Sequence, residues 1–356
     1  MANKNNKKWF VYIILVVIAL FIIKPLSDDE ILPVQVTAQN HINTNTSKHE
    51  PKKITFQPPQ KDEKQANPVG YVPYKVKPHY PTQDVFDENI CSIDKLHMDY
   101  KPLLKNAINS LNDRYQHYHY NISAHLELNI YATKMTAYFE KELIERISTL
   151  HQEYINLLGK SAEREINLNL VITPERSDYD HYVSLYSANL IESLGVYFGG
   201  VNIAFVDYQS SDDKALKTAI HETVHALNAH IIGKTPRMFN EGMAEFYENM
   251  VVKEGNIEII FTRRQLTKEP YPLMQFFDYQ QWSSLNIHHL YYSSWAWIAF
   301  MFGDNNRIHS LISFMEKEQI DPCTSFSAGE SYEILQENDS MFEPDFYLWQ
   351  QNMNTN

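Results

Sequence analysis

Proline is concentrated in one early stretch of the chain, and this restricts where a folded domain can form. Nine of the 16 prolines lie between Pro25 and Pro81, among Lys, Gln, Asn, Asp and Thr residues that show no apolar periodicity. Such a stretch is extended and buries too little apolar surface to fold. We therefore expect residues 25–90 to be a linker and residues 91–356 to form the folded domain.

An apolar run precedes this linker. It comprises the 15 residues Trp9–Ile23 and is flanked by a lysine on each side. As a helix the run spans about 22 Å, short of the roughly 30 Å hydrocarbon core, but flanking lysines can reach the membrane interface. We predict a cytoplasmic tail over residues 1–8 and an uncleaved signal-anchor over 9–24, with the remainder exported to the periplasmic or extracellular side. A cleaved signal peptide is the alternative, and it also exports the domain.

The charge balance excludes one class of partner. The chain has 44 acidic and 31 basic residues, and the expected domain, residues 91–356, holds 35 of the acidic and 20 of the basic ones. A nucleic-acid binder needs a basic face that replaces counterions around phosphates, so we expect no nucleic-acid partner. A solvated acidic surface explains the excess, with an acidic cleft for a basic substrate as the alternative.

The chain contains two cysteines, Cys91 and Cys323. Two are too few for a disulfide framework or for a zinc site built from cysteines. In an exported domain an even number favours one disulfide, which would join the end of the linker to the C-terminal region. Two buried free thiols are the alternative.

Within the expected domain, helical and strand patterns succeed one another. Apolar residues spaced by three and four predict a helix over residues 131–158. Alternation predicts a strand over 166–173, and a second strand is expected over 200–206. Two helices follow, one over about 211–232 and one from Pro236 to about Val252. This order indicates an α+β fold with a small mixed or antiparallel sheet and a helical C-terminal part.

The first of these two helices contains the sequence HETVH. His221 and His225 are four residues apart and lie on one helix face, so that both imidazoles can bind one zinc ion. Glu222 lies about 100° further around the helix and can reach a zinc-bound water without binding the metal. Because zinc lowers the pKa of that water to about 7, a nearby carboxylate can take its proton.

Two histidines leave a catalytic zinc one protein ligand short. A metzincin has its third histidine six residues after the second, and Ile231 stands there, which excludes that class. His230 is one residue short of the required place, so we expect it to be a surface or packing residue. Glu241 and Glu245 on the next helix point the same way; one can bind zinc while the other holds a ligand imidazole from behind. A solvated helix face is the alternative for this pair.

These motifs resemble those of gluzincin metallopeptidases, the class of thermolysin and the aminopeptidase-N-like enzymes, and in particular the compact bacterial peptidase MA-like domains. The resemblance covers about residues 165–305. It comprises the matched segments GVYFGGVNIAFV, HETVH, FNEGMAEF and YYSSWAWIAF. It implies a zincin-like fold in which an HExxH helix is followed by a helix that carries the third ligand.

The same resemblance assigns roles to individual residues. It implies that His221, His225 and Glu241 bind Zn²⁺. Glu245, four residues after the ligand glutamate, is then expected to accept a hydrogen bond from His221. Tyr291 is implied as the donor to the oxyanion, with core packing as the alternative; Tyr292, His288 and His289 are its neighbours.

Together these observations predict a membrane-anchored, exported zinc metallopeptidase that hydrolyses peptide bonds in peptides or proteins with a zinc-activated water. Glu222 is expected to be the general base and then the proton donor. The strand over 200–206 is expected either to pair with an extended substrate or to be an ordinary interior strand. Two other functions stay open: a non-catalytic exported binding or scaffold domain of the same fold, and a zinc hydrolase of cell-wall amide bonds.

Overall fold

The computed structural model describes residues 31–32, 36–38, 54–56, 100–187, 193–208, 211–262, 269–277, 286–337 and 339–355. The chain divides into Met1–Glu30 and a second unit, Ile31–Asn356, to which all of these residues belong. The predicted tail and signal-anchor, residues 1–24, lie outside the described residues, as does Cys91. Among the residues described, no helix combines the length and the apolar character needed to cross a bilayer.

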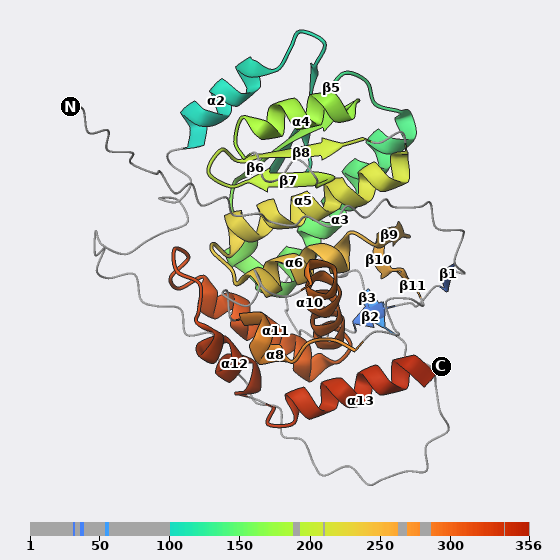
Figure 1. Ribbon diagram of the computed structural model, residues 1–356, viewed down its shortest axis with the longest axis vertical. Helices are drawn as coiled ribbons and strands as arrows, with labels where there is room; N and C mark the ends of the chain where they lie inside the picture. The colour runs from blue at the N-terminus through green and yellow to red at the C-terminus, as the bar shows by residue number, and fades with distance from the viewer. Residues whose placement is uncertain are drawn as a thin grey trace, which may run out of the picture. The chain divides into compact units, whose positions relative to one another are not determined.

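A five-stranded mixed sheet occupies the upper part of the described fold (Figure 1). Its central strands β5, β6 and β8 are parallel, and the edge strands β4 and β7 each run antiparallel to their neighbour. In spatial order the strands are β4 (Gln116–Asn121), β5 (Leu126–Ala132), β6 (Ile166–Thr173), β8 (Ile203–Asp207) and β7 (Gly195–Phe198). This confirms the α+β class with a small mixed sheet.

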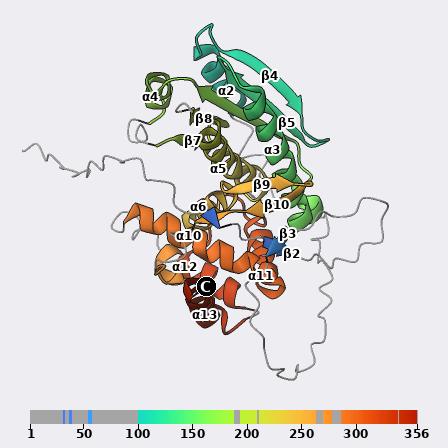
Figure 2. The same cartoon turned by 90° about the vertical axis from the view of Figure 1, so that its right-hand side faces the viewer.

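Helices cover both faces of the sheet (Figures 1 and 2). On one face lie α3 (Ala137–Leu158) and α5 (Asp212–Ile231), which pack on the inward residues of the central strands. On the other face lie α2 (Tyr100–Ser110) and α4 (Arg176–Ser184), which enclose a smaller core around Phe205. Because side chains alternate along a strand, each central strand contributes to both cores.

Below the sheet, a group of helices is arranged around α10 (Ile287–Phe302), which is apolar on all sides and therefore almost wholly buried. Its Trp297 stacks on Phe346 with ring centroids 3.5 Å apart. The surrounding helices are α6 (Arg237–Tyr247), α8 (Leu273–Phe277), α11 (Asn305–Glu318), α12 (Ala328–Gln336) and α13 (Phe342–Thr355). A short 3₁₀ helix, η1 (Gly159–Ala162), follows α3.

Several short strands lie outside the main sheet. The strands β9 (Met250–Lys253) and β10 (Asn256–Ile259) form a hairpin. Three more lie inside the predicted linker of residues 25–90, where no regular structure was expected. They are β1 (Ile31–Leu32), which pairs with β11 (Phe261–Thr262), and the pair β2 (Val36–Ala38) and β3 (Ile54–Phe56).

The strand predicted over 166–173 and the helix predicted over about 211–232 are confirmed as β6 and α5. The helix predicted over 131–158 begins six residues late, because residues up to Ala132 belong to β5. Thr136 then starts α3, since its hydroxyl accepts a hydrogen bond from the backbone N–H of Phe139 at 3.0 Å.

Two further boundaries differ from the prediction. The helix expected from Pro236 to about Val252 ends at Tyr247, because the residues from Met250 onward belong to β9. The β9–β10 hairpin then turns through Glu254 and Gly255, both with positive φ. The strand expected over 200–206 begins at Ile203, because Asn202 has a left-handed φ of 55° and ends the turn after β7.

Candidate metal centre

His221 and His225 lie one turn apart on α5, on the side that faces α6. Their ring centroids are 4.8 Å apart and the ring planes are nearly perpendicular, at 83°. Both side chains are mostly buried, with exposures of 15% and 12%. On the other faces of α5, residues such as Ala219, Ile220 and Val224 pack into the core. The amphipathic pattern of α5 therefore determines which way the two imidazoles point.

Glu241 on α6 completes a group of three metal-ligand atoms. Its Oε2 lies 3.6 Å from Nε2 of His221 and 3.5 Å from Nε2 of His225. In a tetrahedral zinc site with bonds of about 2.0–2.1 Å, ligand atoms lie about 3.3–3.5 Å from one another. The observed spacings fit this geometry, and two imidazoles with one carboxylate are a common ligand set for catalytic zinc. The structure thus brings the three predicted ligands together.

A buried hydrogen-bond chain holds the start of α6 against the end of α5. The hydroxyl of Tyr154 donates to Oδ1 of Asn228 at 2.6 Å, and Nδ2 of Asn228 donates to Oδ1 of Asn240 at 2.9 Å. Asn240 immediately precedes the candidate ligand Glu241. Buried amides with both partners satisfied restrict the approach of the two helices. The chain therefore helps to place Glu241 opposite the two histidines.

Gly242 sets the distance between α6 and α10. A Cβ at this position would lie 2.7 Å from the carbonyl oxygen of Ser294 and 2.7 Å from Cγ1 of Ile298. Only glycine permits this approach, so Gly242 in the FNEGMAEF segment has a packing role. The close crossing brings Tyr291, near the start of α10, within electrostatic reach of Glu241 and His221.

Tyr291 hydrogen-bonds with Arg237, the first residue of α6. Nε of Arg237 also lies 3.8 Å from Oε1 of Glu241. Burial, with the nearby negative charge of Glu241, raises the pKa of the Tyr291 phenol to about 12. The phenol is therefore protonated at neutral pH and can donate a hydrogen bond beside the metal centre.

The neighbours of Tyr291 have partners elsewhere. Nε2 of His289 lies 2.6 Å from the carbonyl oxygen of Glu269, and its ring stacks on Tyr271 with centroids 4.2 Å apart. Tyr292 is buried and hydrogen-bonds with Gln350. His288 is exposed.

Glu222 is buried, with 4% of its surface exposed, and lies under the edge strand β7. Its carboxylate accepts a hydrogen bond from the backbone N–H of Tyr197. A Cβ at Gly195 would lie 2.7 Å from Oε1 of Glu222, so glycine is required for β7 to approach α5 this closely. Burial raises the pKa of the Glu222 carboxyl, which makes it a stronger base than an exposed glutamate.

The carboxylate behind His221 belongs to Glu248, and the prediction of Glu245 is wrong. Nδ1 of His221 lies 3.0 Å from Oε2 of Glu248. Along a helix, a residue seven positions on lies about 20° from the starting direction, whereas one four positions on lies about 40° away. Glu248, seven residues after Glu241, therefore projects from nearly the same line of α6 and reaches His221 from one turn further along. The Glu245 carboxylate is close by, and burial with the charge of Glu248 raises its pKa to about 8.

Two other predictions are decided by the fold. His230 is buried, and its Nε2 lies 2.9 Å from Oδ1 of Asn202, so it is a packing residue as expected. The strand over 200–206 corresponds to β8, which has β6 on one side and β7 on the other. With both its edges paired, β8 cannot bind an extended substrate, and of the two alternatives the interior strand is correct. The edge strand beside the metal centre is β7.

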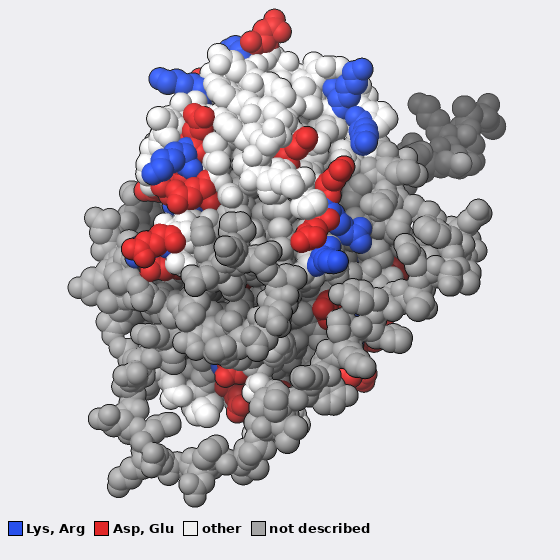
Figure 3. All heavy atoms as spheres, turned by 180° about the vertical axis from the view of Figure 1, so that it is seen from behind, with Lys and Arg blue, Asp and Glu red and all other residues white. Residues whose placement is uncertain are grey.

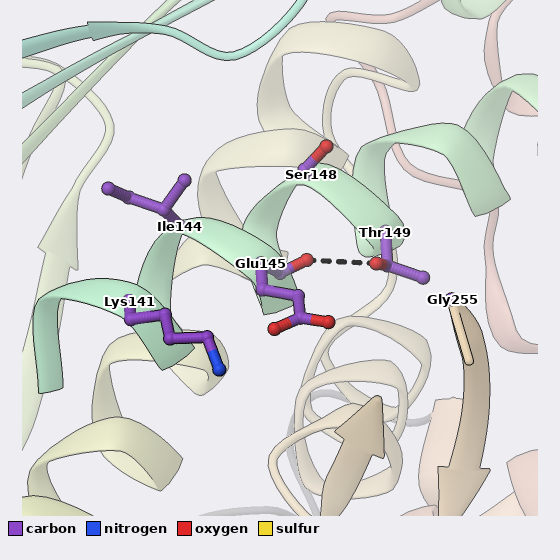
Figure 4. A pocket seen from close by; sticks show the side chains of 6 residues that line it. All are labelled: Lys141, Ile144, Glu145, Ser148, Thr149 and Gly255. Atoms are coloured by element: carbon purple, nitrogen blue, oxygen red, sulfur yellow. Dashed lines mark hydrogen bonds between the residues drawn. The ribbon is translucent and has the colours of Figure 1, made fainter. Parts of the chain in front are cut away.

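The described structure also bears on the cysteines and the surface charge. Cys323 is disulfide-bonded; its predicted partner Cys91 lies outside the described residues, so that pairing stays a prediction. On the face seen from behind, the described acidic and basic side chains that are visible are interspersed (Figure 3). A cavity of about 420 Å³ between α3 and the β9–β10 turn is lined by residues outside the metal centre (Figure 4): Lys141, Ile144, Glu145, Ser148, Thr149 and Gly255.

Sequence reasoning missed two residues of the centre, Arg237 and Glu248. Both lie on the Glu241 side of α6, four residues before and seven residues after the ligand, so helical spacing was the available signal.

No protein-family model matches the chain, and no curated protein matches it significantly. The assignment of the centre therefore depends on its own geometry.

Proposed function

We propose that this chain is a zinc metallopeptidase of the gluzincin type, with a zincin-like fold, that cleaves peptide bonds in peptides or proteins. One observation carries the proposal: Oε2 of Glu241 lies 3.6 and 3.5 Å from Nε2 of His221 and His225, close to the spacing of a tetrahedral zinc site. The buried Glu222 lies on the same helix as the two histidines. From the sequence alone we extend the proposal to an exported protein held at the membrane by residues 9–24.

The residues around the centre divide the chemistry between them. A bound Zn²⁺ supplies Lewis acidity and lowers the pKa of a coordinated water to about 7. The Glu222 carboxylate, with its pKa raised by burial, takes a proton from the attacking water and passes it to the nitrogen of the leaving amine. The Tyr291 hydroxyl, held by Arg237, donates a hydrogen bond to the carbonyl oxygen of the scissile bond as negative charge develops there.

The position of β7 supports a peptide substrate over a small amide. Its neighbour in the sheet is β8, and among the described residues no strand pairs with its other edge. The backbone of Tyr197 on this strand touches Glu222, so the edge adjoins the general base. An extended peptide paired with β7 would pass beside the metal centre, held mainly by backbone hydrogen bonds.

The test uses the full-length, zinc-loaded protein in detergent, with a peptide library and casein as substrates and peptidoglycan fragments as a parallel arm. We expect cleavage of peptides, and Glu222→Gln should reduce the rate by at least about 10²–10⁴-fold while the zinc content stays at one per chain. Cleavage of peptidoglycan amides alone would replace the peptidase by a cell-wall hydrolase. Peptide binding without turnover would make the protein a binding domain.

A further inference from the structure

A chain of hydrogen bonds continues beyond Glu248 to two residues outside the group of His221, His225 and Glu241, namely Asn249 and Lys217. Nδ2 of Asn249 donates to Oε1 of Glu248 at 3.3 Å, and it also donates to the carbonyl oxygen of Glu245 at 3.2 Å. Nζ of Lys217 donates to Oδ1 of Asn249 at 2.9 Å. Lys217 and His221 are four residues apart on α5, so the hydrogen-bond chain leaves α5 at His221, crosses the end of α6 and returns to α5 one turn earlier, at Lys217.

In this hydrogen-bond chain, each side chain determines how the next side chain is oriented. A lysine ammonium can only donate hydrogen bonds, so Lys217 requires the oxygen of the Asn249 amide to face it. The amide nitrogen of Asn249 must then face Glu248, where it binds Oε1 and leaves Oε2 for His221. Asn249 is buried, with 8% of its surface exposed, whereas Lys217 is exposed. The buried amide is therefore the main constraint, and the exposed lysine adds a weaker, solvent-screened one.

We propose that Asn249 is a positioning residue for the metal centre, supported by Lys217: it holds Glu248 against Nδ1 of His221 and so directs Nε2 of that ring toward Glu241 and His225. The inference rests on the proposed function in one respect only: it takes Nε2 of His221 to be a ligand of a metal ion. Without the Asn249 amide, the Glu248 carboxylate at the end of α6 would lose a buried donor and turn toward solvent. The His221 ring would then be free to rotate away from the position that the metal requires.

The substitution Asn249→Asp tests this with almost no change in volume. It removes the donor and places a second negative charge opposite Glu248. Asn129→Asp is a matched control, because Asn129 is also 8% exposed and hydrogen-bonded, but belongs to β5 beside His117. Thermal unfolding of the metal-free proteins measures any general loss of stability, which both variants should share.

Two measurements on the full-length protein report on the centre itself. In the metal-free protein with ¹⁵N-labelled histidine, the Nδ1–H proton of His221 should give a downfield resonance protected from solvent exchange. We expect Asn249→Asp to abolish this resonance and to weaken Zn²⁺ affinity, measured against a competing chelator, by about 10–100-fold. Asn129→Asp should change neither. A folded Asn249→Asp protein that keeps both the resonance and the zinc affinity would overturn the proposal.

Lys217 provides a second test should Asn249→Asp not fold, since an exposed lysine tolerates substitution. Lys217→Met should weaken zinc affinity by several-fold. Lys217→Arg keeps a hydrogen-bond donor, so its zinc affinity should stay close to that of the parent. Equal zinc affinity in Lys217→Met and the parent would contradict the proposal in that case. Both readouts are independent of turnover, so a protein that binds zinc in this way but cleaves no peptide would refute the proposed function alone.

Discussion

Replacing Gly195 by alanine should uncouple catalysis from metal binding. The added Cβ would lie 2.7 Å from Oε1 of Glu222 and 2.4 Å from Cγ2 of Thr218. Ordinary contacts of a Cβ begin at 3.4 Å, so Glu222 must move by about 0.7 Å and α5 must separate from β7 by up to about 1 Å. Misplacing a catalytic group by about 1 Å typically reduces the rate about 10²-fold, and overpacking costs about 1–3 kcal/mol of stability.

A second substitution separates these two effects. Thr218→Ser deletes the methyl group that makes the closer contact, so Gly195→Ala combined with Thr218→Ser should recover most of the lost stability. The contact with Glu222 persists in the double variant, and its rate should therefore stay low. Gly200→Ala is the control, because a Cβ there meets no atom within 4 Å.

The assays are chemical denaturation for the free energy of unfolding, peptide hydrolysis for kcat, and metal analysis for zinc content. Zinc content should be equal in all these variants, because none of the substituted residues is one of the three candidate ligands. If Gly195→Ala kept the parent's kcat, Glu222 would not work from its position under β7, and the assignment of the general base would be wrong.

Three further predictions concern the carboxylates and the disulfide. Glu248→Gln should weaken zinc affinity by about 10–100-fold, and Glu245→Gln should leave it nearly unchanged; the reverse order in a chelator competition would restore the original choice of Glu245. Burial raises the pKa of Glu153 to about 7, so the folded protein binds this proton more tightly than the unfolded chain and loses stability as pH rises from about 4.5 to 7. Glu153→Gln should therefore flatten the pH dependence of unfolding by up to roughly 3 kcal/mol, and a parallel shift at all pH values would contradict this. Reduction of the disulfide at Cys323 should destabilise the protein by about 4–5 kcal/mol if it closes a loop to Cys91; labelling of free thiols in the unfolded, unreduced protein checks it.

Much of the candidate centre could be predicted from the sequence because its central element is local. The amphipathic pattern of α5 places His221 and His225 on one face through backbone geometry alone, whatever packs around them. The alternating residues of β6 are predictable for the same reason, since the period of a strand is two. The choice of Glu241 as third ligand came from its spacing and the resemblance, and the structure places it at the matching distance.

Other parts of the centre depended on where elements end and how they cross. Helical spacing places Glu248 only about 20° nearer than Glu245 to the direction of Glu241, and the approach of α6 to α5 then decides that Glu248 reaches His221. The close crossing at Gly242 brings Tyr291 to the centre, and the order of strands in the sheet makes β7, and not β8, the edge beside Glu222. Local periodicity follows from hydrogen bonds between near neighbours in the chain, whereas these contacts join residues far apart in sequence and are chosen only when the core packs.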